Sequence, residues 1–204
     1  MAKSSRLVFT ILVGLLAGPV VAAHADGDIC LTPGANKNLS NCVFTDKDLS
    51  GTDFENSILT GANLTRADLS DTNLTGVTSG SIKGVPSRLP VGWALIGGYL
   101  LGPGADLSGA ILSKLNLKNL DLSDAKLPLA QITESDLTNT NLSGANLNYV
   151  TLLKSNVTGV NLSDTSLTGI YSRTLNGTPA SLPADWNLIQ GYLVGPNANL
   201  NDSS

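Results

Sequence analysis

Hydrophobic residues recur every five positions over most of the chain. In residues 37–76 the series comprises Leu39, Phe44, Leu49, Phe54, Leu59, Leu64, Leu69 and Leu74. It resumes at residue 105 and comprises Leu107, Leu112, Leu117, Leu122, Leu127, Ile132, Leu137, Leu142, Leu147, Leu152, Val157, Leu162 and Leu167. Neither the period of an α-helix, about 3.6 residues, nor the period of a β-strand, about 2 residues, produces this spacing. The pattern therefore predicts a repeat architecture.

Within each unit, a small or apolar residue often stands two positions before the large hydrophobic residue, as Ala62 and Ala67 do. The residue between them is polar, and an alternation of inward, outward and inward side chains is typical of a β-strand. The remaining two positions are rich in Ser, Thr, Asp and Gly, which favour turns. Each repeat is thus predicted to be a short strand followed by a corner.

The units at residues 62–66 (Ala-Asn-Leu-Thr-Arg) and 67–71 (Ala-Asp-Leu-Ser-Asp) closely resemble the pentapeptide-repeat family. The resemblance covers residues 37–76 and 105–174. It implies an all-β fold, a right-handed quadrilateral β-helix, in which four repeats close one coil of about twenty residues. Here the solenoid is expected to form two blocks separated by a hairpin-bearing insert.

Residues twenty apart are then expected to stack. The expected interior column is Leu107, Leu127, Leu147 and Leu167. The expected outer pairs are Asp46 over Arg66 and Glu134 over Lys154, and the expected polar ladder is Asp121, Asn141 and Asn161. Leu115 and Leu120 replace the usual small residue, so local swelling or a shifted register is expected there.

Two inserts, residues 77–104 and 170–197, interrupt the repeat and match each other at an offset of 93 residues. Each contains Leu-Pro, then Trp-x-Leu-Ile-x-Gly-Tyr-Leu, then Gly-Pro, similar to a motif of exported bacterial pentapeptide-repeat proteins. We interpret each as a Pro-rich loop followed by a β-hairpin, with turns at Gly97-Gly98 and Gln190-Gly191. The second is predicted to cap the solenoid, and the first to pack on its outer wall between the two blocks.

The aromatic side chains of the inserts have two interpretations. They either cover a side or an end of the solenoid, where open strand edges must be blunted, or form a contact site for a partner. The candidate contact or cap residues are Trp93, Tyr99, Trp186 and Tyr192.

The N-terminus has the pattern of a signal peptide, residues 1–25. Lys3 and Arg6 precede an apolar stretch, and Ala23-His24-Ala25 forms a cleavage site. The alternative, an uncleaved anchor, needs about 20 apolar residues, and the stretch is shorter and interrupted. We expect export to the periplasm, the exterior or a lumen, with no stable membrane span after cleavage.

Cys30 and Cys42 are the two cysteines of the chain. An exported chain meets oxidising conditions, which favour a disulfide between them. The alternative is that Cys42 is a small buried thiol, because it falls at a repeat position that takes a small residue.

Charge and composition exclude several functions. Removal of residues 1–25 leaves ten basic and sixteen acidic side chains, without a basic patch for nucleic acid. The single histidine, His24, lies in the signal peptide, so the mature chain has no histidine base or ligand. We therefore expect no catalytic residue, no metal and no cofactor.

The predicted segments are a signal peptide (1–25), an N-terminal segment (26–36), a first block (37–76), a first insert (77–104), a second block (105–174) and a second insert with the C-terminal cap (175–204). The predicted function is that of a noncatalytic exported structural or protein-binding solenoid, with its partner and oligomeric state left open. The alternative that the resemblance implies is a DNA mimic that binds topoisomerases. A signal peptide and a net charge of −6 in the mature chain argue against it.

Overall fold

The computed structural model describes residues 30–201, so the predicted signal peptide lies outside the described residues. Every named element in this range is a short β-strand. The strands are β1 (Ala94–Ile96), β2 (Tyr99–Leu101), β3 (Gln131–Thr133), β4 (Thr151–Leu153), β5 (Tyr171–Arg173), β6 (Asn187–Ile189) and β7 (Tyr192–Val194). Most of the remaining repeats pair through isolated parallel bridges.

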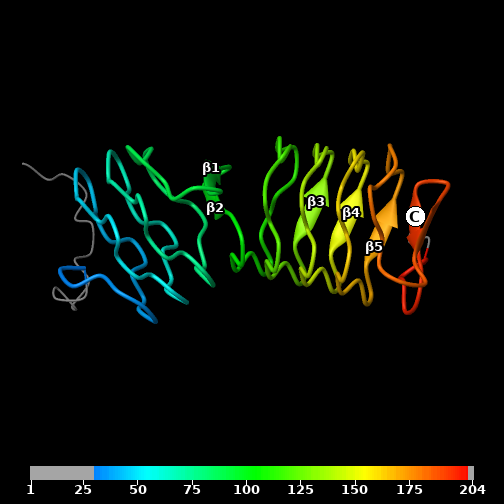
Figure 1. Cartoon of the computed structure of the whole chain (residues 1–204), viewed down its shortest axis with the longest axis horizontal. Coiled ribbons are helices and arrows are strands. Elements are labelled where there is room, and N and C mark those ends of the chain that lie inside the picture. Colours follow the sequence, from blue (N-terminus) through cyan, green and yellow to red (C-terminus); the bar gives the residue numbers. More distant parts are fainter. Residues whose placement is uncertain (1–29, 202–204) are drawn as a thin grey trace, which may run out of the picture.

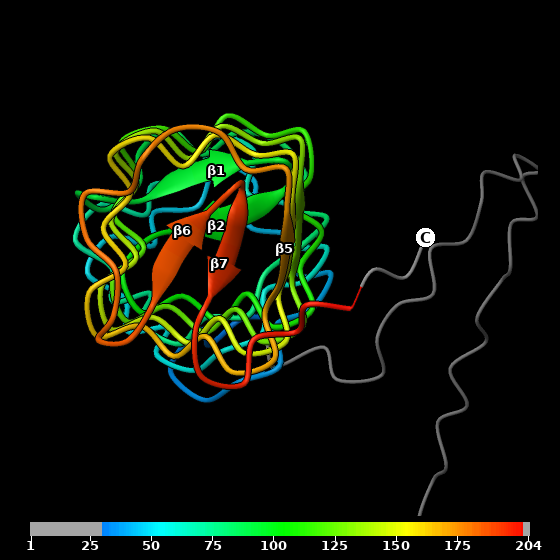
Figure 2. The same ribbon diagram turned by 90° about the vertical axis from the view of Figure 1, so that its right-hand side faces the viewer.

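The chain winds into coils of twenty residues that stack along one axis (Figure 1). Parallel bridges join Asp106 to Lys126, Lys126 to Asn146, and Asn146 to Ser166. Viewed along the axis, the coils outline a four-sided section (Figure 2). These observations confirm the predicted all-β, right-handed quadrilateral β-helix.

The interior is a set of stacked hydrophobic columns. Leu107, Leu127, Leu147 and Leu167 are all buried, as the repeat predicts. The Leu107 amide donates to the carbonyl of Lys126, and the Lys126 amide donates back to the carbonyl of Ala105. Each coil is therefore bonded to the next along the whole strand, which spreads the stability of the fold over nearest-neighbour contacts.

Serine and threonine side chains also lie in the interior, where their hydroxyl groups form hydrogen bonds. The Ser135 hydroxyl donates to the carbonyl of Leu112 at 2.7 Å, and the Thr140 hydroxyl donates to that of Leu117, also at 2.7 Å. No buried side-chain nitrogen or oxygen within residues 30–201 lacks a partner. Serine and threonine can thus replace alanine in the core without the cost of an unpaired polar group.

The corners turn through residues with a positive φ, such as Asn139 at 56° and Gly144 at 69°. Glycine, asparagine and aspartate adopt this left-handed conformation at the least cost. This requirement accounts for the abundance of these residues at the last position of the repeat.

The inserts lengthen single coils. Thr78 bridges Asp106, and Tyr171 bridges Asn199, so each of these coils has 28 residues in place of 20. The extra length accommodates the antiparallel hairpins β1–β2 and β6–β7. In the first, Gly97 and Gly98 form the two-residue turn with φ of 60° and 80°, as a tight hairpin requires. The hairpin prediction is confirmed for both inserts.

The predicted position of the first insert on the outer wall is wrong. Hairpin β1–β2 lies across the section of the solenoid, between the two blocks (Figures 1 and 2). Leu100 is fully buried in the hydrophobic core of the first block, and the adjacent Leu101 is fully buried in that of the second. Because successive strand residues point to opposite faces, the hairpin forms a partition between two separate cores.

A shift in register at Leu115 and Leu120 is not observed. Bridges continue without an offset, and both side chains are half-buried against the core of the second block. Leu115 approaches the turn of the first hairpin at Gly97. The larger side chain therefore helps to seat the hairpin.

Cys30 and Cys42 form a disulfide, with their Cα atoms 5.6 Å apart. Cys42 is also buried at the position that alanine occupies in other repeats. The bond thus ties the segment before the first coil to the core of that coil.

Candidate functional site

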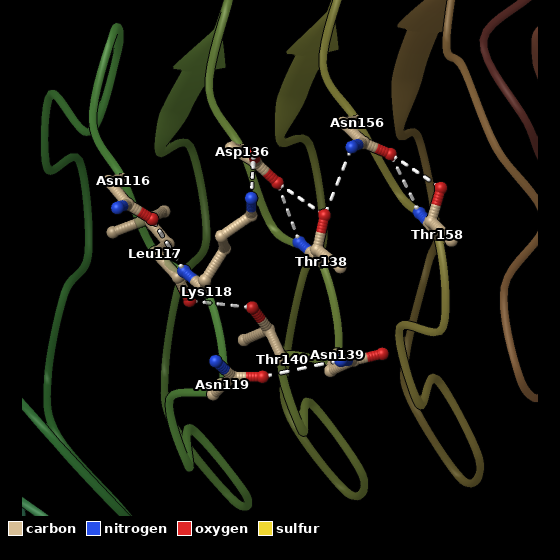
Figure 3. A network of polar contacts seen from close by, with 10 residues as sticks. All are labelled: Asn116, Leu117, Lys118, Asn119, Asp136, Thr138, Asn139, Thr140, Asn156 and Thr158. Carbon is tan, nitrogen blue, oxygen red and sulfur yellow. Dashed lines mark hydrogen bonds and ion pairs between the residues drawn. The ribbon is translucent and has the colours of Figure 1, made fainter.

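Much of the outer surface follows one hydrogen-bonding rule. The Asp136 carboxylate accepts hydrogen bonds from both the amide and the hydroxyl of Thr138, at 3.0 and 2.5 Å. The Asn156 side chain makes the same two bonds with Thr158, one coil further on (Figure 3). Such a side chain accepts the hydrogen bond of the backbone amide two residues further on, so this amide does not bond to the next coil. The strand is thereby reduced to a single bridge, and the surface polar groups are largely bonded to one another.

These local bonds also stabilise the ionised carboxylates. The hydrogen bonds from Thr138, followed by the neighbouring Lys118 ammonium, hold the pKa of Asp136 below its usual value. The hydrogen bonds from Ser50 do the same for the pKa of Asp48. Lys118 approaches Asp136 at 3.1 Å. The carboxylates of Asp48 and Asp136 thus act as hydrogen-bond acceptors within the surface.

Polar side chains also form ladders between coils. The Asn141 amide donates to Asp121, and the Asn161 amide donates to Asn141, each at 3.0 Å. This is the predicted ladder.

The predicted outer ion pairs are also present. Arg66 binds Asp46 through two nitrogens, at 2.5 and 2.6 Å. Lys154 lies 3.9 Å from Glu134. Exposed pairs of this kind contribute little to stability.

One face of the second block departs from this rule. Strands β3, β4 and β5 form a three-stranded parallel sheet there. Its first outward position is occupied by Gln131, Thr151 and Tyr171, in place of Asn or Asp. Because no asparagine or aspartate side chain bonds the amide two residues further on, the backbones of the three coils pair as regular parallel strands. This sheet face is therefore distinct in both structure and chemistry.

Large apolar side chains border the sheet face. Leu129 is 66% exposed and Tyr149 is 60% exposed, on neighbouring coils, and both have a positive φ, of 63° and 59°. Bulky residues in this conformation are outliers that cost roughly 1–2 kcal/mol each. Other corners hold large residues in the same conformation, among them Arg66 and Lys154, so Leu129 and Tyr149 are set apart by the apolar surface that they expose.

A cavity of about 290 Å³ lies at the other border of the sheet face. It is lined by Leu153, Lys154, Tyr171, Arg173 and Thr174. Its lining combines the basic side chains of Lys154 and Arg173 with the larger side chains of Leu153 and Tyr171. Together with Leu129, Tyr149 and the exposed Ile111, these residues combine apolar contact area with charged side chains, among which Lys154 lies 3.9 Å from Glu134.

The structure does not bring the four predicted insert residues together. Trp93 and Tyr99 lie between the two blocks, whereas Trp186 and Tyr192 lie in the terminal coil. The tryptophans are half-buried over Gly102 and Gly195. The Tyr99 hydroxyl accepts a hydrogen bond from the amide of Ile111 at 3.2 Å.

The five-residue pattern does not predict the sheet face, although the sequence holds a sign of it. Leu129 and Tyr149 occupy the corner position that elsewhere holds mostly glycine, asparagine or aspartate.

The described part of the chain contains no group of three or more histidine, cysteine, aspartate or glutamate side chains able to hold a metal ion. Within residues 30–201 there is also no helix of the length and apolarity needed to cross a bilayer.

The geometry defines a protein class, a four-sided β-helix of five-residue repeats. The family model for pentapeptide repeats matches eight copies, over residues 38–76, 103–128 and 129–164. The chain belongs to the pentapeptide-repeat family. No curated protein sequence matches it.

Solved structures of the same family are similar to this chain. A pentapeptide repeat protein from the cyanobacterium Cyanothece is 27% identical over 62% of this chain and 65% of its own, with a TM-score of 0.33. One from the Arabidopsis thaliana thylakoid lumen is 27% identical over 74% of this chain and 75% of its own, with a TM-score of 0.31. HetL, from the cyanobacterium Nostoc, is 20% identical over 77% of this chain and 74% of its own, with a TM-score of 0.27. This chain thus spans less than two thirds of the Cyanothece protein.

Proposed function

We propose that this protein is an exported, noncatalytic solenoid that binds a protein partner through the sheet face of strands β3–β5. The observation that carries the proposal is the pair Leu129 and Tyr149, which expose large apolar side chains while holding a strained backbone conformation. Exposed apolar residues that gather beside basic groups are typical of protein-binding surfaces.

Export is supported by two features of the chain. The first is the signal-peptide pattern of residues 1–25. The second is the Cys30–Cys42 disulfide, since such bonds persist in oxidising compartments. Detection of the chain with an intact N-terminus in the cytoplasm would contradict this part of the proposal.

The rigidity of the solenoid suits it to binding. The sheet face is built on backbone bonds between successive coils, such as those that pair Gln131 with Thr151 and Thr151 with Tyr171. A partner therefore meets side chains that are already positioned, and little ordering entropy opposes association. The alternative of a DNA mimic needs a strongly acidic surface, whereas this face carries Lys154 and Arg173.

The test is site-specific photo-crosslinking in the source cells. A photoreactive residue at Leu129 is expected to give a discrete protein adduct. The matched control is Asn139, an exposed corner with a φ of 56° that lies half a coil away, on the opposite edge of the solenoid. Adducts of equal yield from both positions, or from neither, would show that the sheet face is not the binding surface.

A further inference from the structure

The ladder of parallel bridges is interrupted where the two blocks meet. In the last coil before the boundary, a bridge joins Asp68 to Arg88. In the first coil after it, a bridge joins Asn116 to Asp136. Among the described residues no bridge joins Arg88 to Asn116, which stand at the same place in successive coils. Hairpin β1–β2 lies between the blocks (Figure 1) and keeps the two coils apart on this side.

The interruption leaves the backbone of Asn116 open on the side of the first block. One coil further on, the Asp136 amide donates to the carbonyl of Leu115 at 3.0 Å, and the Asp136 carbonyl accepts from the amide of Leu117 at 2.8 Å. The corresponding amide and carbonyl of Asn116 have no hydrogen-bond partner within residues 30–201. An unpaired donor and acceptor on one side of a strand are the groups with which an added strand pairs.

Two leucine side chains lie along the same edge. Leu115 and Leu120 are half-buried, whereas their counterparts in the next coil, Ser135 and Thr140, are only 3% and 0% exposed. The indole of Trp93, in the first insert, is also half-buried and packs against the cores of both blocks. The edge therefore combines unpaired backbone groups with apolar side chains that the neighbouring coil does not cover.

We propose that the edge of residues 115–120 is a strand-addition site for a partner protein. An extended segment of the partner pairs with the amide and carbonyl of Asn116 and directs apolar side chains toward Leu115 and Leu120. In this mode of recognition the main-chain hydrogen bonds give affinity, and the side chains on either side give specificity. The site is separate from the sheet face of strands β3–β5 and does not depend on it.

The charges around this edge favour an uncharged segment. The two lysines that flank Asn116 in the chain already lie near carboxylates, Lys114 at 3.9 Å from Glu134 and Lys118 at 3.1 Å from Asp136. A charged segment would compete with these pairs, whereas an uncharged one leaves them in place. The segment that fits best is therefore extended, apolar and uncharged, with a free backbone amide at the residue that pairs.

The test begins with a phage library of random heptapeptides, selected on the mature chain, residues 26–204. The enriched peptides should carry apolar residues two positions apart, because alternate residues of a strand face the same side. They should lack proline at the residue between, since proline has no amide to donate. The affinity of one enriched peptide for the chain and its variants is then measured by fluorescence anisotropy.

Two substitutions at one position isolate the backbone amide. Both Asn116→Pro and Asn116→Ala remove the side-chain oxygen that accepts from the Lys118 amide, but only proline also removes the amide of residue 116. We expect Asn116→Pro to weaken peptide binding about tenfold and Asn116→Ala by less than about twofold. The unfolding midpoints of the two variants should be similar, because the amide of Asn116 bonds to nothing else within residues 30–201.

Leu120→Thr keeps the test decisive if proline disturbs the coil. It introduces the residue that the next coil carries at the same place, Thr140, and should weaken peptide binding several-fold by removing apolar contact. Equal affinity of the wild type, Asn116→Pro and Leu120→Thr would overturn the proposal, as would a selection without enriched peptides. Peptides that lose affinity for Leu129→Asn alone would bind the sheet face, which would overturn strand addition and leave the proposed function in place.

Discussion

The indole of Trp93 lies against the backbone of Gly102, so closely that a Cβ atom on this glycine would stand 2.2 Å from Cδ2 of the ring. Gly76 donates to the carbonyl of Gly104, and Gly104 donates to that of Ser123. Gly102 is therefore the counterpart of the large hydrophobic residue in the neighbouring coils. The tryptophan of the insert supplies the volume that the glycine lacks, and Trp186 and Gly195 repeat the arrangement.

Replacement of Gly102 by alanine should overpack the boundary between the two blocks. We expect Gly102→Ala to lower the free energy of unfolding by about 1–3 kcal/mol, the usual cost of overpacking. Urea denaturation measures the effect. Gly195→Ala creates the same clash with the indole of Trp186 and should also lower the free energy of unfolding. Equal stability of Gly102→Ala and the wild type would contradict this packing.

Replacement of Leu129 by asparagine should stabilise the fold while weakening partner binding. Asparagine adopts a φ near 63° more readily than leucine does. Little burial is lost, since the Leu129 side chain is largely exposed. We expect a gain of about 0.5–1 kcal/mol in denaturation experiments. A loss of stability would mean that Leu129 serves packing and not binding.

Cleavage of the disulfide should loosen the first coil. The bond closes a short loop, with the two cysteines 12 residues apart, so its removal should cost about 3 kcal/mol in the chain-entropy model. Hydrogen exchange of Cys30→Ala should show lower protection for the first coil, residues 37–56. The coils of residues 126–165 provide the control. Equal loss of protection in both regions would argue against a local effect.

The stability of the solenoid should depend on pH in the acid range. Hydrogen bonds from Ser50, Ser70 and Thr138 lower the pKa values of Asp48, Asp68 and Asp136. A lowered pKa in the folded state stabilises the fold above the unfolded value, and this contribution is lost as the pH falls through the folded value. The thermal midpoint should therefore be steady down to about pH 5 and fall below about pH 4.

Asp136→Asn gives the matched control for this dependence. An asparagine at this position keeps a side-chain oxygen that can accept the hydrogen bond from the Thr138 amide, as the Asn156 side chain accepts one from Thr158 in the next coil. Unlike aspartate, it cannot be protonated in this pH range. Its thermal midpoint should fall less steeply below about pH 4 than that of the wild type. An unchanged slope would remove Asp136 from the set of groups responsible.

The sequence was sufficient for the architecture because the information is local and repeated. The spacing of Leu107, Leu127 and Leu147 specifies which residues stack, and an error in register would expose every one of them. The two hairpin turns could be predicted as well, because Gly97-Gly98 allows a positive φ at both positions. The number of cysteines and the expected compartment favoured the disulfide over a buried thiol at Cys42, and the structure contains the bond.

The candidate site could not be predicted in the same way. The sheet face arises where Gln131, Thr151 and Tyr171 fall on adjacent coils, which joins residues that are far apart in the chain. In the sequence, Leu129 is a single exception to the usual corner residues, and nothing indicates that Tyr149, twenty residues later, will lie next to it. Only the stacking of the coils brings the two exceptions together on one surface.

The sequence by itself thus determined the repeat, the interior and the hairpins, because each depends on neighbours within a few residues or one coil. The tertiary structure decided where the hairpins go. Leu100 and Leu101 are adjacent in the chain but belong to two different cores. Leu107 is buried because the following coil stacks on it. The physical reason is that burial along a solenoid is set by whatever stacks on each coil.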